Sequence, residues 1–118
     1  MKRWPLALLV AAVAGGCGGK PEHVTAGDAA MGREVIAEAG CGVCHEIPGI
    51  AGARGRLGPS LAGLGNRRLI AGQLPNRQDV LARWIRNAPA FAPQTAMPPM
   101  PLDENAARDA AAYLARLR

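Results

Sequence analysis

The chain has 118 residues, a length typical of one domain, and its 14 basic residues outnumber nine acidic ones to give a formal net charge of +5. Hydrophobic residues make up 49% of it, but only four are aromatic, and 15 glycines and 10 prolines interrupt the pattern. This composition excludes a coiled coil, a charged disordered tail and a multidomain enzyme. Because aromatic side chains usually dominate burial in small domains, their scarcity indicates that another group fills the centre.

The first 16 residues have the pattern of an export signal. Two basic residues precede the apolar stretch Pro5–Gly16, which at 12 residues is too short for a membrane-spanning helix of about 20. The stretch ends at Cys17 and resembles a bacterial lipobox, in which the cysteine becomes lipidated and starts the mature protein. We therefore predict a lipoprotein signal peptide at 1–16, a lipid on Cys17 and a tether at 17–26. An ordinary export signal with an incidental cysteine is the alternative.

Lipidation would also explain why the chain has an odd number of cysteines. An unpaired thiol is unusual in an exported protein, and an anchored Cys17 leaves Cys41 and Cys44 as a pair. This predicts a protein on the periplasmic side of a bacterial membrane, with the inner and the outer membrane both open. His23 lies in the predicted tether and is expected to be solvated.

The first regular element expected after the tether is a helix at 28–39. Its apolar residues recur at spacings of three and four, Asp28 can cap its first turn, and Gly40 can end it. Residues 41–77 show little periodicity apart from one short helix expected near 60–64. So long a loop is uncommon in a small domain unless it surrounds a ligand.

Two further helices are expected, at 77–87 and 103–117, each with an apolar stripe along one face. Between them, five prolines at 89–101 are expected to forbid helix and sheet alike. No segment shows the alternation of a strand, and no internal repeat is visible. The sequence therefore predicts one all-α domain at 27–118, with three to five helices.

The pattern C-x-x-C-H at Cys41, Cys44 and His45 is the one used for attachment of a c-type haem. Two thiols three positions apart lie on the same side of one helical turn, where they can form thioethers with the two vinyl groups. The adjacent imidazole can then coordinate the iron. Gly42, which lacks a Cβ, is expected to let the chain pass close to the porphyrin. One covalent haem c would also supply the large apolar group that the composition lacks.

Three other interpretations of these cysteines have weaker support. A zinc site needs four ligands, and beyond Cys41 and Cys44 the chain offers only two histidines. A thioredoxin-like redox pair requires a βαβ context that is missing here. A structural disulfide or a chance pattern is the third.

What such a haem does depends on the second axial ligand of its iron. The candidates are Met31, Met97, Met100 and His23, and of these Met97 and Met100 lie in a proline-rich loop that can hold a thioether rigidly. Methionine ligation raises the reduction potential relative to bis-histidine ligation. It also blocks the open position that peroxidase or gas-binding chemistry requires.

From about residue 27 to 117 the chain resembles a class I cytochrome c. Gly32 is similar to the glycine at which the family's terminal helices cross, and Tyr113 to the aromatic residue that it meets. The sequence G-P-S-L resembles the family segment in which a proline carbonyl accepts a hydrogen bond from the proximal histidine. The resemblance implies that Pro59 orients this histidine and that Leu61 lines the haem.

The family's distal ligand loop is matched by the sequences N-A-P, P-Q-T and Met-Pro that follow Trp84. This match selects Met97 over Met100 as the second axial ligand. The resemblance further implies that Trp84 occupies the haem crevice and that Thr95 forms a hydrogen bond towards a propionate.

A narrower resemblance links residues 58–86 with the cytochrome c domain fused to subunit II of some bacterial haem-copper oxidases, and with small periplasmic cytochromes. The membrane anchor and the copper-binding portion of that subunit are missing from this sequence. The resemblance implies that Asn76 and one of two arginines, Arg68 or its neighbour Arg67, contact the haem propionates.

The charge distribution is consistent with a protein partner. Seven arginines and one acidic residue, Asp79, lie between Arg54 and Arg86. Most of these arginines are expected to form a solvated basic face that steers an acidic redox partner, an effect that fades with salt. Nucleic acid is excluded as a partner because the protein is predicted to be exported and has no recognition motif.

These features predict a monomeric electron carrier rather than an enzyme. It would hold one haem c between His45 and Met97 and transfer single electrons between partners of a bacterial respiratory chain. The alternatives are an electron-entry subunit held by a dehydrogenase or terminal oxidase and, third, a five-coordinate haem sensor or peroxidase.

Overall fold

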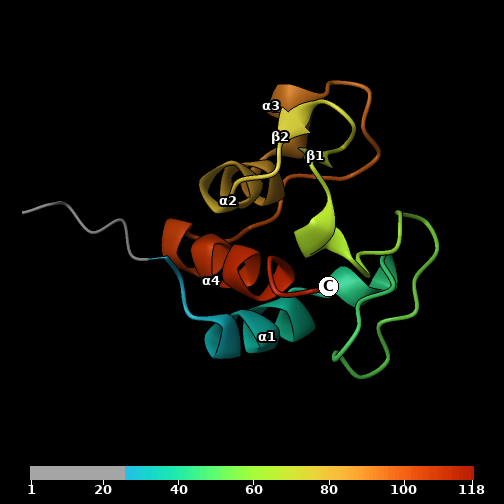
Figure 1. The fold of residues 1–118 in the computed structure, drawn as a ribbon. Coiled ribbons are helices and arrows are strands. Elements are labelled where there is room, and N and C mark those ends of the chain that lie inside the picture. Colours follow the sequence, from blue (N-terminus) through green and yellow to red (C-terminus); the bar gives the residue numbers. More distant parts are fainter. Residues whose placement is uncertain (1–25) are drawn as a thin grey trace, which may run out of the picture.

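A computed structural model describes residues 26–118, which form a mostly helical domain (Figure 1). The predicted signal peptide, the predicted lipidation site Cys17 and nearly all of the predicted tether, His23 included, lie outside the described residues. In chain order the elements are α1 (Ala29–Glu38), the 3₁₀ turns η1 (Cys41–Val43) and η2 (Leu64–Asn66), strands β1 (Leu69–Ile70) and β2 (Leu74–Pro75), and helices α2 (Gln78–Arg86), α3 (Ala88–Phe91) and α4 (Glu104–Leu114).

Helix α4 lies between α1 on one side and α2 on the other (Figure 1). Its buried face is made almost entirely of small residues: Ala107, Ala110, Ala111, Ala112 and Leu114. Small side chains allow the neighbouring helices to approach closely. None of the helices within residues 26–118 is long and apolar enough to cross a membrane.

The crossing of α1 and α4 depends on a glycine. A Cβ on Gly32 would overlap with the carbonyl group of Asp109, so only glycine fits here. The family resemblance predicted an aromatic partner, whereas the atoms nearest to Gly32 belong to the backbone of Asp109 and Ala110. Tyr113 instead donates a hydrogen bond from its hydroxyl to the carbonyl oxygen of Pro48, at 2.7 Å.

The start of α1 is held by local and distant hydrogen bonds. The Asp28 carboxylate accepts from the backbone amides of Ala30 and Met31 at 2.8 and 3.2 Å, as its position before the helix predicted. The backbone amide of Asp28 in turn donates to the Asp109 carboxylate at 2.6 Å. The first helix therefore begins where α4 anchors it.

Helix α2 contributes the larger side chains of the core. Val80, Leu81, Trp84 and Ile85 are all buried, as their helical spacing predicted. Asp79 lies in the first turn and basic residues in the last, which is the favourable arrangement for the helix dipole. Hydrogen bonding to Arg77, the larger cause, and the nearby positive charges lower the pKa of the Asp79 carboxyl.

Three expectations about the regular structure were wrong. Helix α3 includes Pro89, because proline is tolerated in a first turn, where its missing N–H has no partner to lose. Strands β1 and β2 form an antiparallel hairpin whose two-residue strands are too short to show alternation. The short helix expected near 60–64 lies at η2 instead. The carbonyl of Leu117, beyond the end of α4, accepts a hydrogen bond from the backbone amide of Gly65 at 2.8 Å.

Substituting Gly32 by alanine tests the close crossing of α1 and α4. In an exposed helix this change would stabilise by about 1 kcal/mol, but here the new Cβ collides with backbone of α4. We expect the free energy of unfolding to fall by about 2–3 kcal/mol, measured by denaturant titration. The exposed helical control Ala37→Ser should change it by no more than about 0.5 kcal/mol. A stabilised Gly32→Ala protein would contradict the crossing.

Candidate functional site

The C-x-x-C-H residues form a single tight turn directly after α1. Hydrogen bonds to the Cys41 carbonyl oxygen come from the backbone amides of Cys44 at 3.2 Å and His45 at 3.0 Å. Both cysteines are free thiols and only partly buried. The turn therefore brings two sulfur atoms and one imidazole together on one short segment.

The imidazole of His45 is oriented by the loop that follows. Its Nδ1 lies 2.7 Å from the carbonyl oxygen of Pro59. Because a carbonyl only accepts, Nδ1 donates the hydrogen of this bond, and in the neutral ring Nε2 then keeps a free lone pair. A neutral imidazole with a free Nε2 is the form that binds a metal.

The backbone at Gly58 lies against the imidazole ring of His45. A Cβ on Gly58 would lie 2.7 Å from Nδ1 of His45 and closer still to Cε1, and no real side chain tolerates such contacts. The Gly58 amide donates to the carbonyl oxygen of Cys44 at 2.7 Å. Ring and loop backbone are thus in direct contact.

Gly42 has a packing role in the structure that the sequence did not reveal. A Cβ at this position would lie 2.7 Å from both Cα and Cβ of Ala53. The absence of a side chain at Gly42 therefore makes room for the segment around Ala53, which packs on the turn. The amide of Gly55 also donates to the Gly42 carbonyl at 3.0 Å, which fixes the two segments together.

The electrostatics of the turn argue against the alternative uses of its cysteines. Burial, together with the nearby Cys44, raises the pKa of the Cys41 thiol above its usual value. Redox-active cysteines usually have lowered values instead, because the thiolate is their reactive form. Residues 26–118 also contain no group of three His, Cys, Asp or Glu side chains that could hold a metal ion.

The methionines differ in exposure. Met31 is 54% exposed on α1 and points away from the core. Met97 and Met100 are partly buried and pack against the core. The amide of Met97 donates to Thr95 Oγ1 at 3.2 Å, so Thr95 fixes the backbone that carries this thioether and keeps its own hydroxyl hydrogen available.

Trp84 is buried and packs on Phe91, with ring centroids 6.4 Å apart and planes inclined by 41°. Its indole N–H makes no hydrogen bond within residues 26–118 and is not sealed from solvent. Leu61 and Leu74 are also partly buried against the core. Phe91 and Leu74 were not predicted as site residues, although Phe91 follows Trp84 by seven residues, the spacing of two helical turns.

Arg67 and Asn76 bind backbone rather than project freely. Arg67 Nη2 donates to the carbonyls of Ser60 at 2.7 Å and Ala62 at 3.2 Å. Asn76 Nδ2 donates to the carbonyls of Leu64 at 2.8 Å and Arg67 at 2.9 Å, which uses both amide hydrogens. In this arrangement Asn76 has no donor left for the propionate contact that the resemblance implied.

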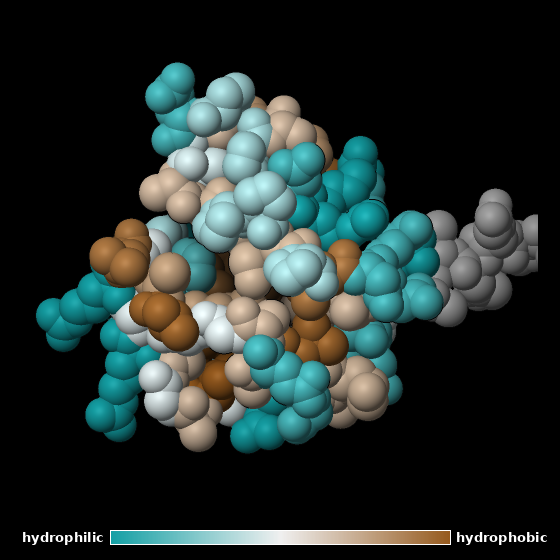
Figure 2. Space-filling model, turned by 180° about the vertical axis from the view of Figure 1, so that it is seen from behind, coloured by the Kyte–Doolittle hydropathy of each residue, from teal (hydrophilic) through white to brown (hydrophobic). Residues whose placement is uncertain are grey.

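Arg68 is exposed, and within residues 26–118 its guanidinium forms no hydrogen bond or ion pair. Of the two neighbouring arginines, it is the one whose five N–H donors all lack a partner within residues 26–118, whereas Arg67 uses both hydrogens of its Nη2. Apolar side chains also reach the surface as separate patches among hydrophilic ones (Figure 2). The most exposed large ones in the described part of the chain are Leu57, Val43, Met31 and Leu69.

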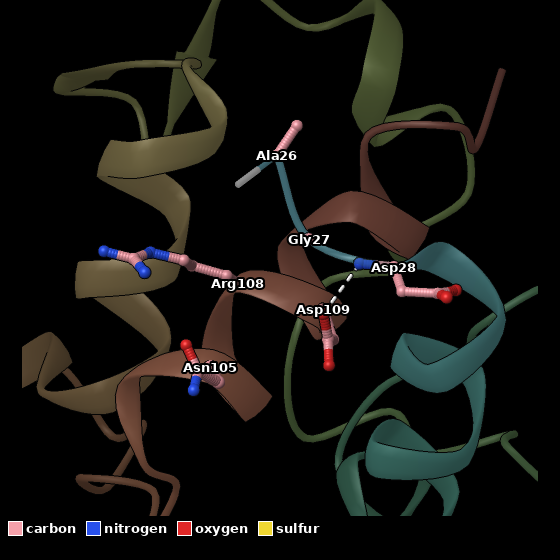
Figure 3. Close-up of a pocket in the computed structure, with 6 residues that line it drawn as sticks. All are labelled: Ala26, Gly27, Asp28, Asn105, Arg108 and Asp109. Atoms are coloured by element: carbon pink, nitrogen blue, oxygen red, sulfur yellow. Dashed lines mark hydrogen bonds between the residues drawn. The ribbon is translucent and has the colours of Figure 1, made fainter. Parts of the chain in front are cut away.

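Two surface pockets lie outside this group of residues. One is formed where the chain enters the domain, lined by Ala26, Gly27, Asp28, Asn105, Arg108 and Asp109, and the bond from the Asp28 amide to Asp109 crosses it (Figure 3). The other is formed by residues that follow His45 in the chain, and is lined by Glu46, Ile47, Pro48, Ala53, Arg54 and Arg56. Neither pocket contains a cysteine or methionine.

The donor set fits a haem c. Two thiols on one turn can form thioethers, and the oriented histidine offers an unprotonated Nε2 for iron. The side chains of Met97 and Met100, together with several loop side chains that are partly buried against the core, supply an apolar surround. These features agree with the chemistry of the C-x-x-C-H pattern.

Residues 29–118 match the sequence model of the cytochrome c family, and the chain belongs to that family. It is also 33% identical over 103 residues to cytochrome c oxidase subunit 2 of Alkalihalophilus pseudofirmus. The match covers 87% of this chain but 29% of the oxidase subunit. The family implies haem c as the cofactor and haem-based electron transfer as the function, and the helical fold is that of a small cytochrome c.

A Gly58→Ala substitution tests the contact that orients His45. The new Cβ collides with the imidazole, so we expect the ring to move and its hydrogen bond to Pro59 to lengthen, visible as shifted imidazole resonances in NMR spectra. The free energy of unfolding should fall by about 1–3 kcal/mol. Gly72→Ala is the control, because its φ of 72° adds backbone strain in open space. It should leave the His45 resonances in place, and equal shifts in both variants would refute the contact.

Proposed function

We propose that this protein is a one-electron carrier of a bacterial respiratory chain. One haem c would be attached through Cys41 and Cys44, with His45 and Met97 as the axial ligands. The observation that carries this proposal is the 2.7 Å hydrogen bond between His45 Nδ1 and Pro59, because it presents Nε2 for coordination. The haem supplies reversible exchange of one electron between ferric and ferrous iron.

The protein's part in this function is to hold the ligands still and keep water away. His45 is fixed by Pro59 and Gly58, so its position can stay the same in both oxidation states. Prolines on either side of Met100, together with the amide of Met97 bound to Thr95, restrict the distal loop. Small structural change between the two states favours fast electron transfer.

The propionates would be received by donors that the fold leaves free. Arg68, the Trp84 indole N–H and the Thr95 hydroxyl have a hydrogen to donate and no acceptor within the described part of the chain. Charged carboxylates near a protein core are costly unless paired, and a planar guanidinium pairs well with them. Asn76 would contribute indirectly, through the backbone that it holds.

The protein would act at the periplasmic side of a bacterial membrane, as a monomer held by a lipid on Cys17. This part of the proposal is supported by the signal-like pattern of residues 1–16 and by the cysteine that follows it. A tether over 17–26 would let the domain reach partners near the membrane surface.

An apolar pair beside the haem-attachment turn would form the docking surface. Val43 and Leu57 are 74% and 86% exposed, and hydrogen bonds between segments 42–44 and 55–58 hold their backbones side by side. Arg54 and Arg56 flank the pair with exposed guanidinium groups that form no ion pair within residues 26–118. An apolar centre with a basic border suits an acidic redox partner.

The likeness to an oxidase subunit favours one second candidate, an electron-entry subunit held permanently by a terminal oxidase. Purification after mild detergent extraction separates the two functions. A free carrier is expected to elute alone, whereas a subunit would elute with the other chains of its complex.

Replacing each methionine of the distal loop tests the choice of axial ligand. Met97→Ala should abolish the methionine-to-iron charge-transfer band of the ferric absorption spectrum and lower the reduction potential, because a soft thioether favours ferrous iron. Met100→Ala is the matched control and should keep the band. Retention of the band in Met97→Ala with its loss in Met100→Ala would contradict the assignment, and a wild-type spectrum without the band would favour a five-coordinate haem.

Neutralising the arginines beside Val43 and Leu57 tests the docking surface. Changing both Arg54 and Arg56 to glutamine should slow bimolecular electron transfer to an acidic partner roughly two- to fivefold at low salt, measured by stopped flow. The difference should vanish near 1 M salt, where charges are screened within about 3 Å. The control changes Arg33 and Arg83 to glutamine, with the same loss of net charge. Equal slowing in both double variants would place the docking surface elsewhere.

A further inference from the structure

Arg67 holds the loop that carries the hydrogen-bond acceptor of His45. Its Nη2 donates one hydrogen to the carbonyl of Ser60 at 2.7 Å and the other to that of Ala62 at 3.2 Å. Ser60 directly follows Pro59, whose carbonyl accepts from His45. Because a guanidinium is planar and rigid, it fixes the two carbonyls relative to each other, and with them the backbone next to Pro59.

Asn76 supports this arrangement from the other side. Its Nδ2 binds the backbone carbonyl of Arg67 at 2.9 Å and that of Leu64 at 2.8 Å, while its backbone amide binds the Arg68 carbonyl at 3.0 Å. The backbone from which the Arg67 side chain extends is therefore fixed as well. Both the side chain and the backbone of Arg67 are thus held by hydrogen bonds.

The loop at residues 60–62 is also hydrogen-bonded directly to the segment that contains His45. The Leu61 amide donates to the carbonyl of Glu46 at 2.9 Å, and Ser60 Oγ lies 3.4 Å from the Glu46 carboxylate. Glu46 is the residue next to His45. A displacement of residues 60–62 would consequently be transmitted to both partners of the bond between His45 and Pro59.

We propose that Arg67 is a positioning residue for His45, acting through the carbonyls of Ser60 and Ala62 to hold the acceptor at Pro59. The inference rests on the proposed function, since it concerns the strength with which His45 would bind iron. A well-placed carbonyl acceptor increases the basicity of a ligating imidazole. Greater basicity favours ferric iron, so losing this alignment should raise the reduction potential.

The test compares three variants of the haem-loaded protein. Arg67→Gln removes the bridge between the carbonyls, Arg67→Lys keeps the charge and one donor group, and Arg116→Gln removes an exposed charge whose side chain binds no backbone within residues 26–118. Hydrogen exchange at His45 Nδ1, followed by NMR in the ferrous state, reports the bond to Pro59 directly. The midpoint potential is measured on the same samples.

We expect Arg67→Gln to accelerate exchange at His45 Nδ1 roughly tenfold, through easier local opening of the loop, and to raise the potential. Arg67→Lys should give a smaller change in both quantities, and Arg116→Gln should leave the exchange rate unaltered. If Arg67→Gln fails to fold, the intermediate acceleration in Arg67→Lys decides the matter, and its absence overturns the proposal.

Two results separate failure of this inference from failure of the proposed function. Unchanged exchange at His45 Nδ1 in Arg67→Gln, with haem bound, overturns the positioning role alone. A shifted potential with unchanged exchange does the same, because it indicates that Arg67 contacts a propionate. A wild-type protein that carries no covalent haem overturns the proposed function, and this inference with it.

Discussion

The hydrogen bond from His45 Nδ1 to the carbonyl oxygen of Pro59 is the interaction on which the site depends. It fixes the proton on one ring nitrogen and leaves the other free, so the imidazole is oriented before any metal arrives. Gly58 secures the arrangement, since its backbone lies against the ring and binds the carbonyl of Cys44. The cysteine turn and the loop after it therefore act as one unit.

The helices provide a scaffold whose interior needs completion. Four of the five buried residues of α4 are alanines, and Gly32 lets α1 approach the α4 backbone directly. Close packing of this kind buries little apolar side-chain area, which is the main source of stability in a small domain. The partly buried loop residues, among them Leu61 and Met97, pack against the core and are not fully enclosed by it.

Much of this structure could be predicted from the sequence because the relevant signals are local. The cap at Asp28 and the apolar face of α2 depend on residues a few positions apart, and the C-x-x-C-H pattern lies within five positions. Contacts between a side chain and the backbone of residues several positions away in the sequence could not be predicted. The acceptors of Arg67 and Asn76 are carbonyl groups, which every residue has, so no pattern reveals which ones are chosen. The hairpin of β1 and β2 was missed for a related reason, since two-residue strands have no periodicity.

The central claim is that the turn from Cys41 to His45 carries a covalent haem that completes the core. The most direct measurement is haem absorbance of the purified wild-type protein after denaturation, combined with its unfolding curve. We expect one haem that stays with the polypeptide, and loss of both colour and cooperative unfolding when Cys41 and Cys44 are changed to alanine together. A colourless wild-type protein that still unfolds cooperatively would contradict it.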